Sequence, residues 1–263
     1  TSSMSSAADF SAVGYFFAKN LSDVLDIPIG MIESDWGGTR IETWMPRSSA
    51  LKIDKNILAT DSTAVYFDKT SVLYNGMIAP ITRFTAKGFI WYQGESDAEI
   101  IDNAQNSMLL KTMISSWRKA FRNPEMPFVM IQLPRINDPS KIRAGWPEFR
   151  EMQDAVAKTV PKVYSVNTID LGSTNSDVHP PFKRPVGERA GNTALNKVYG
   201  KKIPCEGPAL KAFKPSGSNI LVQLDQAAGL TTTDGKEPAQ FEIAGTDGTY
   251  HPAAAEIINR KGN

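Results

Sequence analysis

The chain has 263 residues, of which 41% are hydrophobic and 22% charged, so it can bury a sizeable core and fold as a stable globular protein. Its 29 basic and 28 acidic residues nearly cancel, which argues against nucleic acid or an anionic membrane surface as a partner. The single cysteine, Cys205, excludes an internal disulfide, no Cys/His cluster has the spacing of a zinc site, and no apolar run reaches the roughly 20 residues of a membrane span.

The chain begins with a predicted helix and a predicted strand. Residues 9–25 carry apolar side chains at spacings of three and four, which is the stripe of an amphipathic helix packed on a sheet. Residues 27–32 are apolar and rich in β-branched side chains, and they end in a polar, glycine-containing turn at 33–38. This pattern predicts a strand that leads into a helix.

Short apolar runs then alternate with helical stretches. The runs lack strict alternation of polar and apolar residues, as expected for strands covered on both faces. They lie at 87–93, 127–133 and 163–169, and the helical stretches lie near 101–121, 147–159 and 185–199. This order predicts an α/β fold with a parallel sheet over residues 1–203.

Beyond Gly200, prolines and glycines punctuate short segments such as 220–224 and 240–243, a texture that predicts β structure. We expect residues 204–263 to be a β-rich accessory segment. About 60 residues are few for an independent sandwich, so we interpret the segment as an incomplete module.

A first candidate for chemistry is Ser34, in the turn after the first predicted strand. Ligands of open α/β sheets bind beyond the carboxyl ends of the strands, and the following Gly37 and Gly38 allow close backbone approach. A serine at such a place can act as a nucleophile. The competing interpretation is a capped turn with a packed tryptophan.

A second candidate is the pair Asp177 and His179, just before the last helix. In extended backbone, side chains two apart share a face at roughly 6.5 Å, so the carboxylate can reach the imidazole. Such a pair can take a proton from a serine and return it to a leaving alcohol. Taken alone, Asp-x-His is more often a surface turn. The other histidine, His251, lies in the β-rich tail and is interpreted as a surface residue.

A third cluster, at residues 91–96, ends a predicted strand and should open onto the same crevice. Gln93 can donate an amide hydrogen bond to an oxyanion. Two rival interpretations remain open here. Ser96 nearly fits a Gly-x-Ser-x-Gly nucleophile elbow, and Glu95 could pair with Asp35 or Glu42 as the two carboxylates of a glycosidase.

Five ordered blocks between residues 9 and 200 resemble the sialate O-acetylesterase group of SGNH hydrolases. The blocks with the clearest motifs are Ile-Gly-Met-Ile-Glu-Ser-Asp-Trp-Gly-Gly-Thr at 29–39, Leu-Tyr-Asn-Gly-Met-Ile-Ala-Pro at 73–80, Trp-Tyr-Gln-Gly-Glu-Ser at 91–96 and Asp-Val-His-Pro at 177–180. The chain departs from the wider SGNH pattern, with Ser-x-Trp-Gly-Gly-Thr in place of Gly-Asp-Ser and Gln-Gly-Glu in place of an Asn donor.

The resemblance implies a flavodoxin-like α/β/α sandwich and a serine esterase that removes O-acetyl groups from carbohydrates. It makes Ser34 the nucleophile, His179 the base and Asp177 its partner, and it implies an oxyanion hole from the Ser34 amide, Gly76 and Gln93. No metal or other cofactor is implied. Only the resemblance suggests export to the periplasm or beyond, because the chain itself opens without a signal peptide.

The substrate expected from this resemblance is 9-O-acetyl sialic acid or a related acetylated sugar, with acetyl xylan or pectic sugars as alternatives. Trp36, Arg40 and Glu95 are candidates for contacts to it, although tryptophans more often pack a core and exposed arginines seldom have a dedicated partner. An alternative of another class is an inactive carbohydrate-binding protein on an esterase scaffold, because a fold alone does not establish activity.

Overall fold

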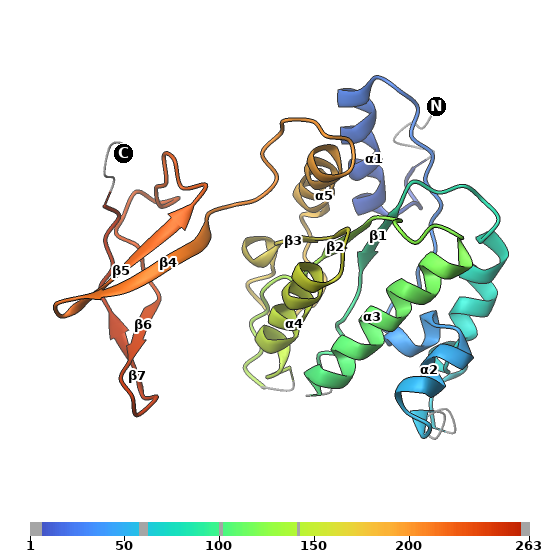
Figure 1. The fold of residues 1–263 in the computed structure, drawn as a ribbon, viewed down its shortest axis with the longest axis horizontal. Coiled ribbons are helices and arrows are strands. Elements are labelled where there is room, and N and C mark those ends of the chain that lie inside the picture. Colours follow the sequence, from blue (N-terminus) through green and yellow to red (C-terminus); the bar gives the residue numbers. More distant parts are fainter. Residues whose placement is uncertain (1–6, 58–62, 100–101, 141–142, 259–263) are drawn as a thin grey trace. The chain divides into compact units, whose positions relative to one another are not determined.

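The structure is a computed structural model of the chain that describes residues 7–57, 63–99, 102–140 and 143–258. The chain divides into two units, with Cys205 the last residue of the first and Glu206 the first of the second. Figure 1 shows both units, coloured along the sequence. The first unit carries all of the candidate catalytic residues.

The centre of the first unit is a parallel sheet of three strands. These are β1 (Phe89–Tyr92), β2 (Phe128–Ile131) and β3 (Val163–Val166), in the order β1-β2-β3. Phe128 of β2 is in register with Phe89 on one side and Val163 on the other. Every residue of β2 is buried, as expected of a central strand with both faces covered.

Helices cover both faces of this sheet. Helices α3 (Asn103–Ala120) and α4 (Trp146–Thr159) pack with Phe128 and Met130 in one apolar cluster. Helices α1 (Ala12–Leu25) and α5 (Lys183–Lys197) pack with Val129 and Ile131 in a second cluster. The alternation of side chains along β2 therefore separates two cores, and the predicted three-layer α/β/α fold is confirmed.

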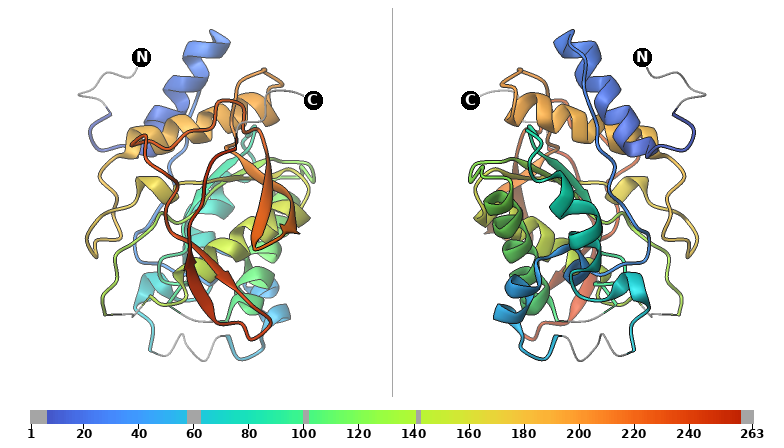
Figure 2. Two further views of the ribbon diagram at one scale, coloured as in Figure 1. Left: turned by 90° about the vertical axis from the view of Figure 1, so that its left-hand side faces the viewer. Right: turned by 90° about the vertical axis from the view of Figure 1, so that its right-hand side faces the viewer.

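The two helices α1 and α5 lie side by side in both views of Figure 2. They approach closely because α5 carries a glycine at the contact: a Cβ at Gly187 would lie 2.7 Å from the carbonyl oxygen of Val13. Ser11 caps the start of α1, because its side chain accepts a hydrogen bond from the Gly14 N–H at 3.2 Å. The predicted N-terminal helix thus forms, and its apolar stripe is buried against α5.

Shorter helical segments complete the first unit. Helix α2 (Arg47–Ile53) packs against α3, and single turns lie at Ile41–Trp44, Tyr66–Asp68, Tyr74–Ile78, Ala79–Ile81 and Ile169–Leu171. The predicted strands and helices between residues 87 and 199 all form, with ends that differ from the prediction by a few residues.

The strand predicted at 27–32 is wrong, because these residues carry no regular secondary structure and pair with no strand of the described sheet. Ile29 and Met31 pack against the second apolar cluster, whereas Ile27 and Ile32 are 47% and 56% exposed. Alternate side chains thus reach the core, as in a strand, but the backbone makes no ladder of hydrogen bonds.

The second unit consists of two antiparallel hairpins, which confirms the predicted β structure. Strands β4 (Ala209–Ser216) and β5 (Asn219–Asp225) form the first, and β6 (Phe241–Ala244) and β7 (Tyr250–Ala253) form the second. The first hairpin turns at Gly217, whose φ of +65° suits a tight two-residue turn. Large apolar side chains such as Phe213 and Tyr250 are exposed.

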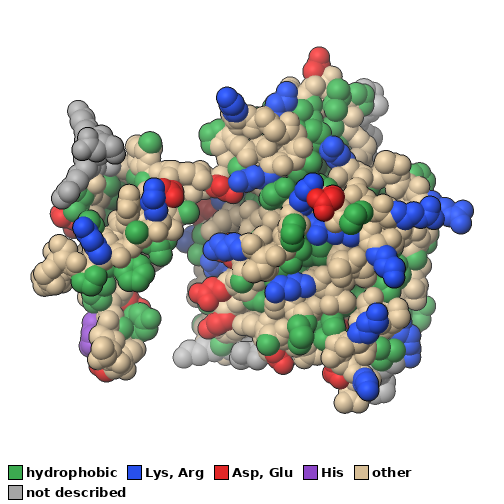
Figure 3. All heavy atoms as spheres, viewed as in Figure 1, with side chains coloured by type: hydrophobic (Ala, Val, Ile, Leu, Met, Phe, Trp, Pro, Cys, Tyr) green, Lys and Arg blue, Asp and Glu red, His purple; other side chains and the backbone are tan. Residues whose placement is uncertain are grey.

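The surface shows no strong concentration of positive charge on the face drawn in Figure 3, where lysines and arginines are scattered. This distribution fits the nearly balanced composition of the chain. In the described residues, no helix has both the length and the apolar character that crossing a membrane requires.

Candidate active site

Asp177 and His179 form a compact pair in the loop that leads into α5. Nδ1 of the imidazole lies 2.9 Å from Oδ1 of Asp177, and the backbone N–H of His179 donates to the same oxygen, also at 2.9 Å. The Asp177 N–H donates in turn to Oδ1 of Asn175 at 3.0 Å. These bonds fix the direction of the imidazole from one side and leave Nε2 on a side chain that is 82% exposed.

The pKa of the Asp177 carboxyl lies below its usual value. The main cause is the hydrogen bond from the His179 backbone N–H, followed by the bond to the imidazole. Both bonds favour the ionised carboxylate. The pair thus has the geometry of a carboxylate that orients a histidine and stabilises its protonated form.

Ser34 lies in the irregular segment before the turn at residues 36–39. Its neighbour Glu33 accepts a hydrogen bond from the Ser11 N–H at 2.7 Å, which fixes the segment at the start of α1. Burial, and then the nearby Asp35, raise the pKa of Glu33. Within the described residues, the half-buried Ser34 forms no hydrogen bond with His179. The chain therefore presents the serine and the base without a direct link between them.

The turn that follows Ser34 is attached to the end of β1. Gln93 donates through Nε2 to the Thr39 carbonyl at 3.1 Å, and Ser96 donates through Oγ to the Gly38 carbonyl at 3.1 Å. Thr39 also accepts a bond from the Trp44 indole N–H at 3.0 Å. The first and third sequence clusters therefore lie together, although residues 27–32 form no strand and the first cluster is not at a strand end.

The amide of Gln93 is fully used inside the protein. Besides the Thr39 carbonyl, it donates to Oδ2 of Asp97 in a short hydrogen bond. A side-chain amide has two N–H groups, so donation to an oxyanion would require Gln93 to exchange one of these bonds.

Glu95 comes to this region on the loop after β1. Burial raises the pKa of Glu95, while the positive Lys183 and the His179 ring oppose that increase. Burial lowers the pKa of Lys183, whose Nζ lies 5.6 Å from the ring centre of Tyr92. The electrostatic effect of His179 on Glu95 links the end of β1 to the start of α5.

The other candidate residues are placed as follows. Arg40 donates through Nε to Asp68 at 3.3 Å, and its backbone N–H donates to the same carboxylate at 2.9 Å. Trp36 is 51% exposed, in agreement with a surface role rather than a core one. Gly76 is exposed in the turn Tyr74–Ile78, where a Cβ would meet no atom within 4 Å.

The rival interpretations receive little geometric support. Ser96 donates its hydroxyl proton to a backbone carbonyl. The charged groups that act on Glu95 are Lys183 and His179, whereas the Glu42 carboxylate acts on Asp97. Among the described residues, no group of three or more His, Cys, Asp or Glu side chains is arranged to hold a metal ion.

Sequence reasoning missed Asp97 and Lys183. Asp97 is 2% exposed and binds both Gln93 and the Ile41 N–H, the latter at 3.3 Å. The sequence shows a carboxylate four residues after Gln93, but it does not show that this carboxylate is buried. Lys183 is the first residue of α5, and the residues that separate it from His179 are not helical, so no periodic pattern in the sequence indicated its proximity.

The three-layer α/β/α fold of this chain, with an Asp–His pair before its last helix, is similar to the fold of a solved carbohydrate esterase, which defines its class. The comparisons specify the family. A sequence model described as "Carbohydrate esterase, sialic acid-specific acetylesterase" matches residues 3–195. The chain belongs to this family, and the resemblance inferred from its sequence blocks is confirmed.

Individual relatives agree with this assignment. A sialate O-acetylesterase of Homo sapiens is 33% identical over 216 residues, which cover 75% of this chain and 41% of that protein. One of Mus musculus is 30% identical over 280 residues, covering 89% of this chain and 51% of that protein. The chain thus spans about half the length of these relatives.

A solved structure is also similar. It is the crystal structure of a carbohydrate acetylesterase from Xanthomonas citri, with a TM-score of 0.82 and 33% sequence identity. The match covers 97% of this chain and 57% of that one.

Proposed function

We propose that this chain carries the esterase site of a carbohydrate O-acetylesterase, with His179 as general base, Asp177 as its orienting partner and Ser34 as nucleophile. The observation that carries the proposal is the Asp177–His179 hydrogen bond, at 2.9 Å, in a member of a carbohydrate esterase family. The assignment of Ser34 is supported by its position beside the turn that binds the end of β1. It requires Ser34 Oγ to come within hydrogen-bonding distance of His179 Nε2 when substrate binds.

The reaction proceeds in two halves. Ser34 Oγ attacks the acetyl carbonyl while His179 Nε2 takes its proton, which gives a tetrahedral oxyanion. The bond to the sugar oxygen then breaks, and His179 returns the proton to the departing hydroxyl. Water attacks the acetyl-serine by the same route, releasing acetate and regenerating Ser34. No metal is required for either half.

The oxyanion is assigned to the Ser34 amide, the Gly76 amide and the Gln93 side chain. Gln93 can take part if it releases the Thr39 carbonyl, because its second N–H remains on Asp97. Each such donor is worth about 10²- to 10³-fold in rate in related hydrolases.

The proposed substrate is 9-O-acetyl sialic acid or a related acetylated sugar, supported by the family description and by the names of the mammalian relatives. Acetyl xylan and pectic sugars present the same ester and are the alternatives. Trp36, which is 51% exposed, is proposed as a stacking surface for a sugar ring. A contact from Arg40 would require its ion pair with Asp68 to open, and Glu95 is proposed as a further contact.

Two further assignments rest on the family resemblance. We assign export to the periplasm or beyond, and an accessory role to residues 204–263.

Hydrolysis of an aryl acetate by the purified chain tests the proposal. Ser34→Ala and His179→Ala should each lower kcat by at least about 10³-fold. Ser115→Ala, an exposed serine on α3, is the matched control and should retain full activity. Equal rates for Ser34→Ala and the native chain would remove Ser34 from the mechanism. Loss of activity in Ser96→Ala instead would favour Ser96 as the nucleophile of an elbow. Release of the aglycone from a glycoside would favour a glycosidase.

A further inference from the structure

A buried carboxylate lies behind the proposed site and takes no part in the chemistry above. Asp97 is 2% exposed, and its two oxygens each accept a hydrogen bond. Oδ1 accepts the Ile41 N–H at 3.3 Å, and Oδ2 accepts the short bond from Gln93 Nε2. We call Asp97, Gln93, Thr39 and Ile41 the Asp97 network.

This network joins two segments that are far apart in the sequence. Gln93 follows directly after β1. Thr39 is the last residue of the turn that follows Ser34, and Ile41 comes two residues later. The loop of Asp97 is in turn held from α3, where the Asn106 side chain donates to the Asp97 carbonyl at 3.3 Å. From α4, the Gln153 side chain donates to the Gln93 carbonyl at 3.3 Å.

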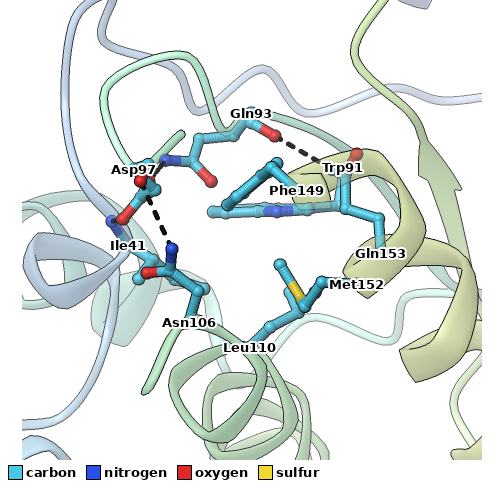
Figure 4. Close-up of a pocket in the computed structure, with 9 residues that line it drawn as sticks. All are labelled: Ile41, Trp91, Gln93, Asp97, Asn106, Leu110, Phe149, Met152 and Gln153. Atoms are coloured by element: carbon cyan, nitrogen blue, oxygen red, sulfur yellow. Dashed lines mark hydrogen bonds between the residues drawn. The ribbon is translucent and has the colours of Figure 1, made fainter. Parts of the chain in front are cut away.

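Figure 4 shows Gln93, Asp97, Asn106 and Gln153 among the side chains around a small cavity with about 10 Å³ of space. The rest of its wall is mainly apolar. Among the nine described residues that line it, Asp97 is the only ionisable one. A charge at this position costs desolvation energy, and an apolar residue or an amide would avoid that cost.

An asparagine could not replace this carboxylate. Both partners of the Asp97 side chain are N–H donors, and each binds a different oxygen, so an asparagine in the same position would offer its oxygen to only one of them. The second donor would face an NH₂ group and lose its partner. Only a carboxylate satisfies both donors at once.

We propose that Asp97 is a positioning residue, whose carboxylate holds Gln93 and the backbone at Ile41 together and so fixes the turn beside Ser34 against the end of β1. The inference rests on the proposed function for its effect on catalysis, but the geometry of the network does not depend on it.

The titration of Asp97 supplies a readout. Burial, and then the neighbouring Glu42 carboxylate, raise the pKa of Asp97 to about 7, while Arg40 acts in the opposite direction. Because the pKa is higher in the folded state than in the unfolded chain, stability from protonated Asp97 is present at acid pH and lost as the pH rises through about 7. The ionised form accepts both hydrogen bonds, so it is the form that should support activity.

The first test is kinetic, on the complete chain with an aryl acetate. Asp97→Asn should lower kcat by about 10²-fold with KM nearly unchanged, because misplaced catalytic groups slow the chemical step. In the native chain, log kcat/KM should fall as the pH drops below about 7, because Asp97 must be ionised. In Asp97→Asn this part of the pH dependence should be absent, so the acid slope becomes less steep. Asp154→Asn, which changes a half-buried α4 carboxylate paired with Lys158 far from the Asp97 network in sequence, is the control.

The second test does not depend on activity. Amide hydrogen exchange at Ile41 should be about tenfold faster in Asp97→Ala than in the native chain, while exchange in β2 stays unchanged. Unchanged kcat and an unchanged acid slope in Asp97→Asn would overturn the positioning role. The proposed function fails if Ser34→Ala and His179→Ala remain fully active. The Asp97 network is rejected separately if amide exchange at Ile41 is unchanged in Asp97→Ala.

Discussion

Oδ1 of Asp177 binds His179 twice, at 2.9 Å from the imidazole Nδ1 and at 2.9 Å from the backbone nitrogen. The backbone bond holds the carboxylate in place whatever the protonation state of the ring. The side chain of Asp177 therefore orients the imidazole and also shapes the loop that enters α5. The two roles can be separated by a substitution that preserves the loop but weakens the effect of Asp177 on the imidazole.

Asp177→Asn is that substitution. Its amide oxygen can still accept the His179 backbone N–H, but it cannot stabilise a protonated imidazole as a carboxylate does. We expect kcat for an aryl acetate to fall by about 10²- to 10⁴-fold with little change in KM. Asp23→Asn, which removes an exposed carboxylate on α1, is the control. Native activity in Asp177→Asn would show that the pair is a surface turn.

The same pair predicts a pH dependence of stability. The pKa of Asp177 is lowered in the folded state, so its contribution to stability is present above the ordinary value of ~3.9 and is lost as the pH falls through the lowered value. The difference in Tm between the native chain and Asp177→Asn should therefore shrink between pH 6 and pH 3. Calorimetry at the two pH values measures it, and a constant difference would contradict the prediction.

Gly94 should tolerate no side chain. Its φ is +141°, and a Cβ would lie 2.3 Å from Cε1 of the buried Phe149. Gly94→Ala should lower the free energy of unfolding by about 3 kcal/mol, from backbone strain and overpacking together. Urea denaturation measures the change. Gly30→Ala, where a Cβ meets no atom within 4 Å, should be nearly neutral, and equal stabilities of the two variants would contradict the packing described here.

Lys183 should offset the cost of burying Glu95. Burial raises the pKa of Glu95 and Lys183 opposes this, so Lys183→Met should raise that pKa further. Stability from protonated Glu95 is present at acid pH and is lost as the pH rises through its folded pKa, so the variant should lose more stability than the native chain between pH 4.5 and pH 8. Thermal melts at both pH values test this. Lys158→Met, on the exposed side of α4, should follow the native curve, and an identical response of Lys183→Met would refute the coupling.

The sequence predicted the layers of the fold because their signals are local. The stripe of apolar residues in α1 and the apolar runs of β1, β2 and β3 report burial directly. The strand predicted at 27–32 failed because pairing depends on a neighbouring backbone, which apolar character does not report. Only Ile29 and Met31 pack against the core there, while Ile27 and Ile32 are exposed, so apolar character overestimated burial as well as hydrogen bonding.

The candidate site was predictable only in part. The bond between Asp177 and His179 follows from their spacing of two residues. The hydrogen bonds from Gln93 to Thr39 and Asp97 could not be predicted in this way. Gln93 and Thr39 are 54 positions apart, and only the folded chain brings them together. For the same reason, spacing alone could not decide whether Ser34 and His179 meet.

The most direct test of the account is to identify the serine that the site activates. A fluorophosphonate probe reacts with serines that a histidine base has activated, and mass spectrometry of the digested chain locates the label. We expect a label on Ser34 that disappears in His179→Ala and persists in Ser115→Ala. A label on another serine, or an unlabelled chain whose aryl acetate hydrolysis still requires His179, would contradict it.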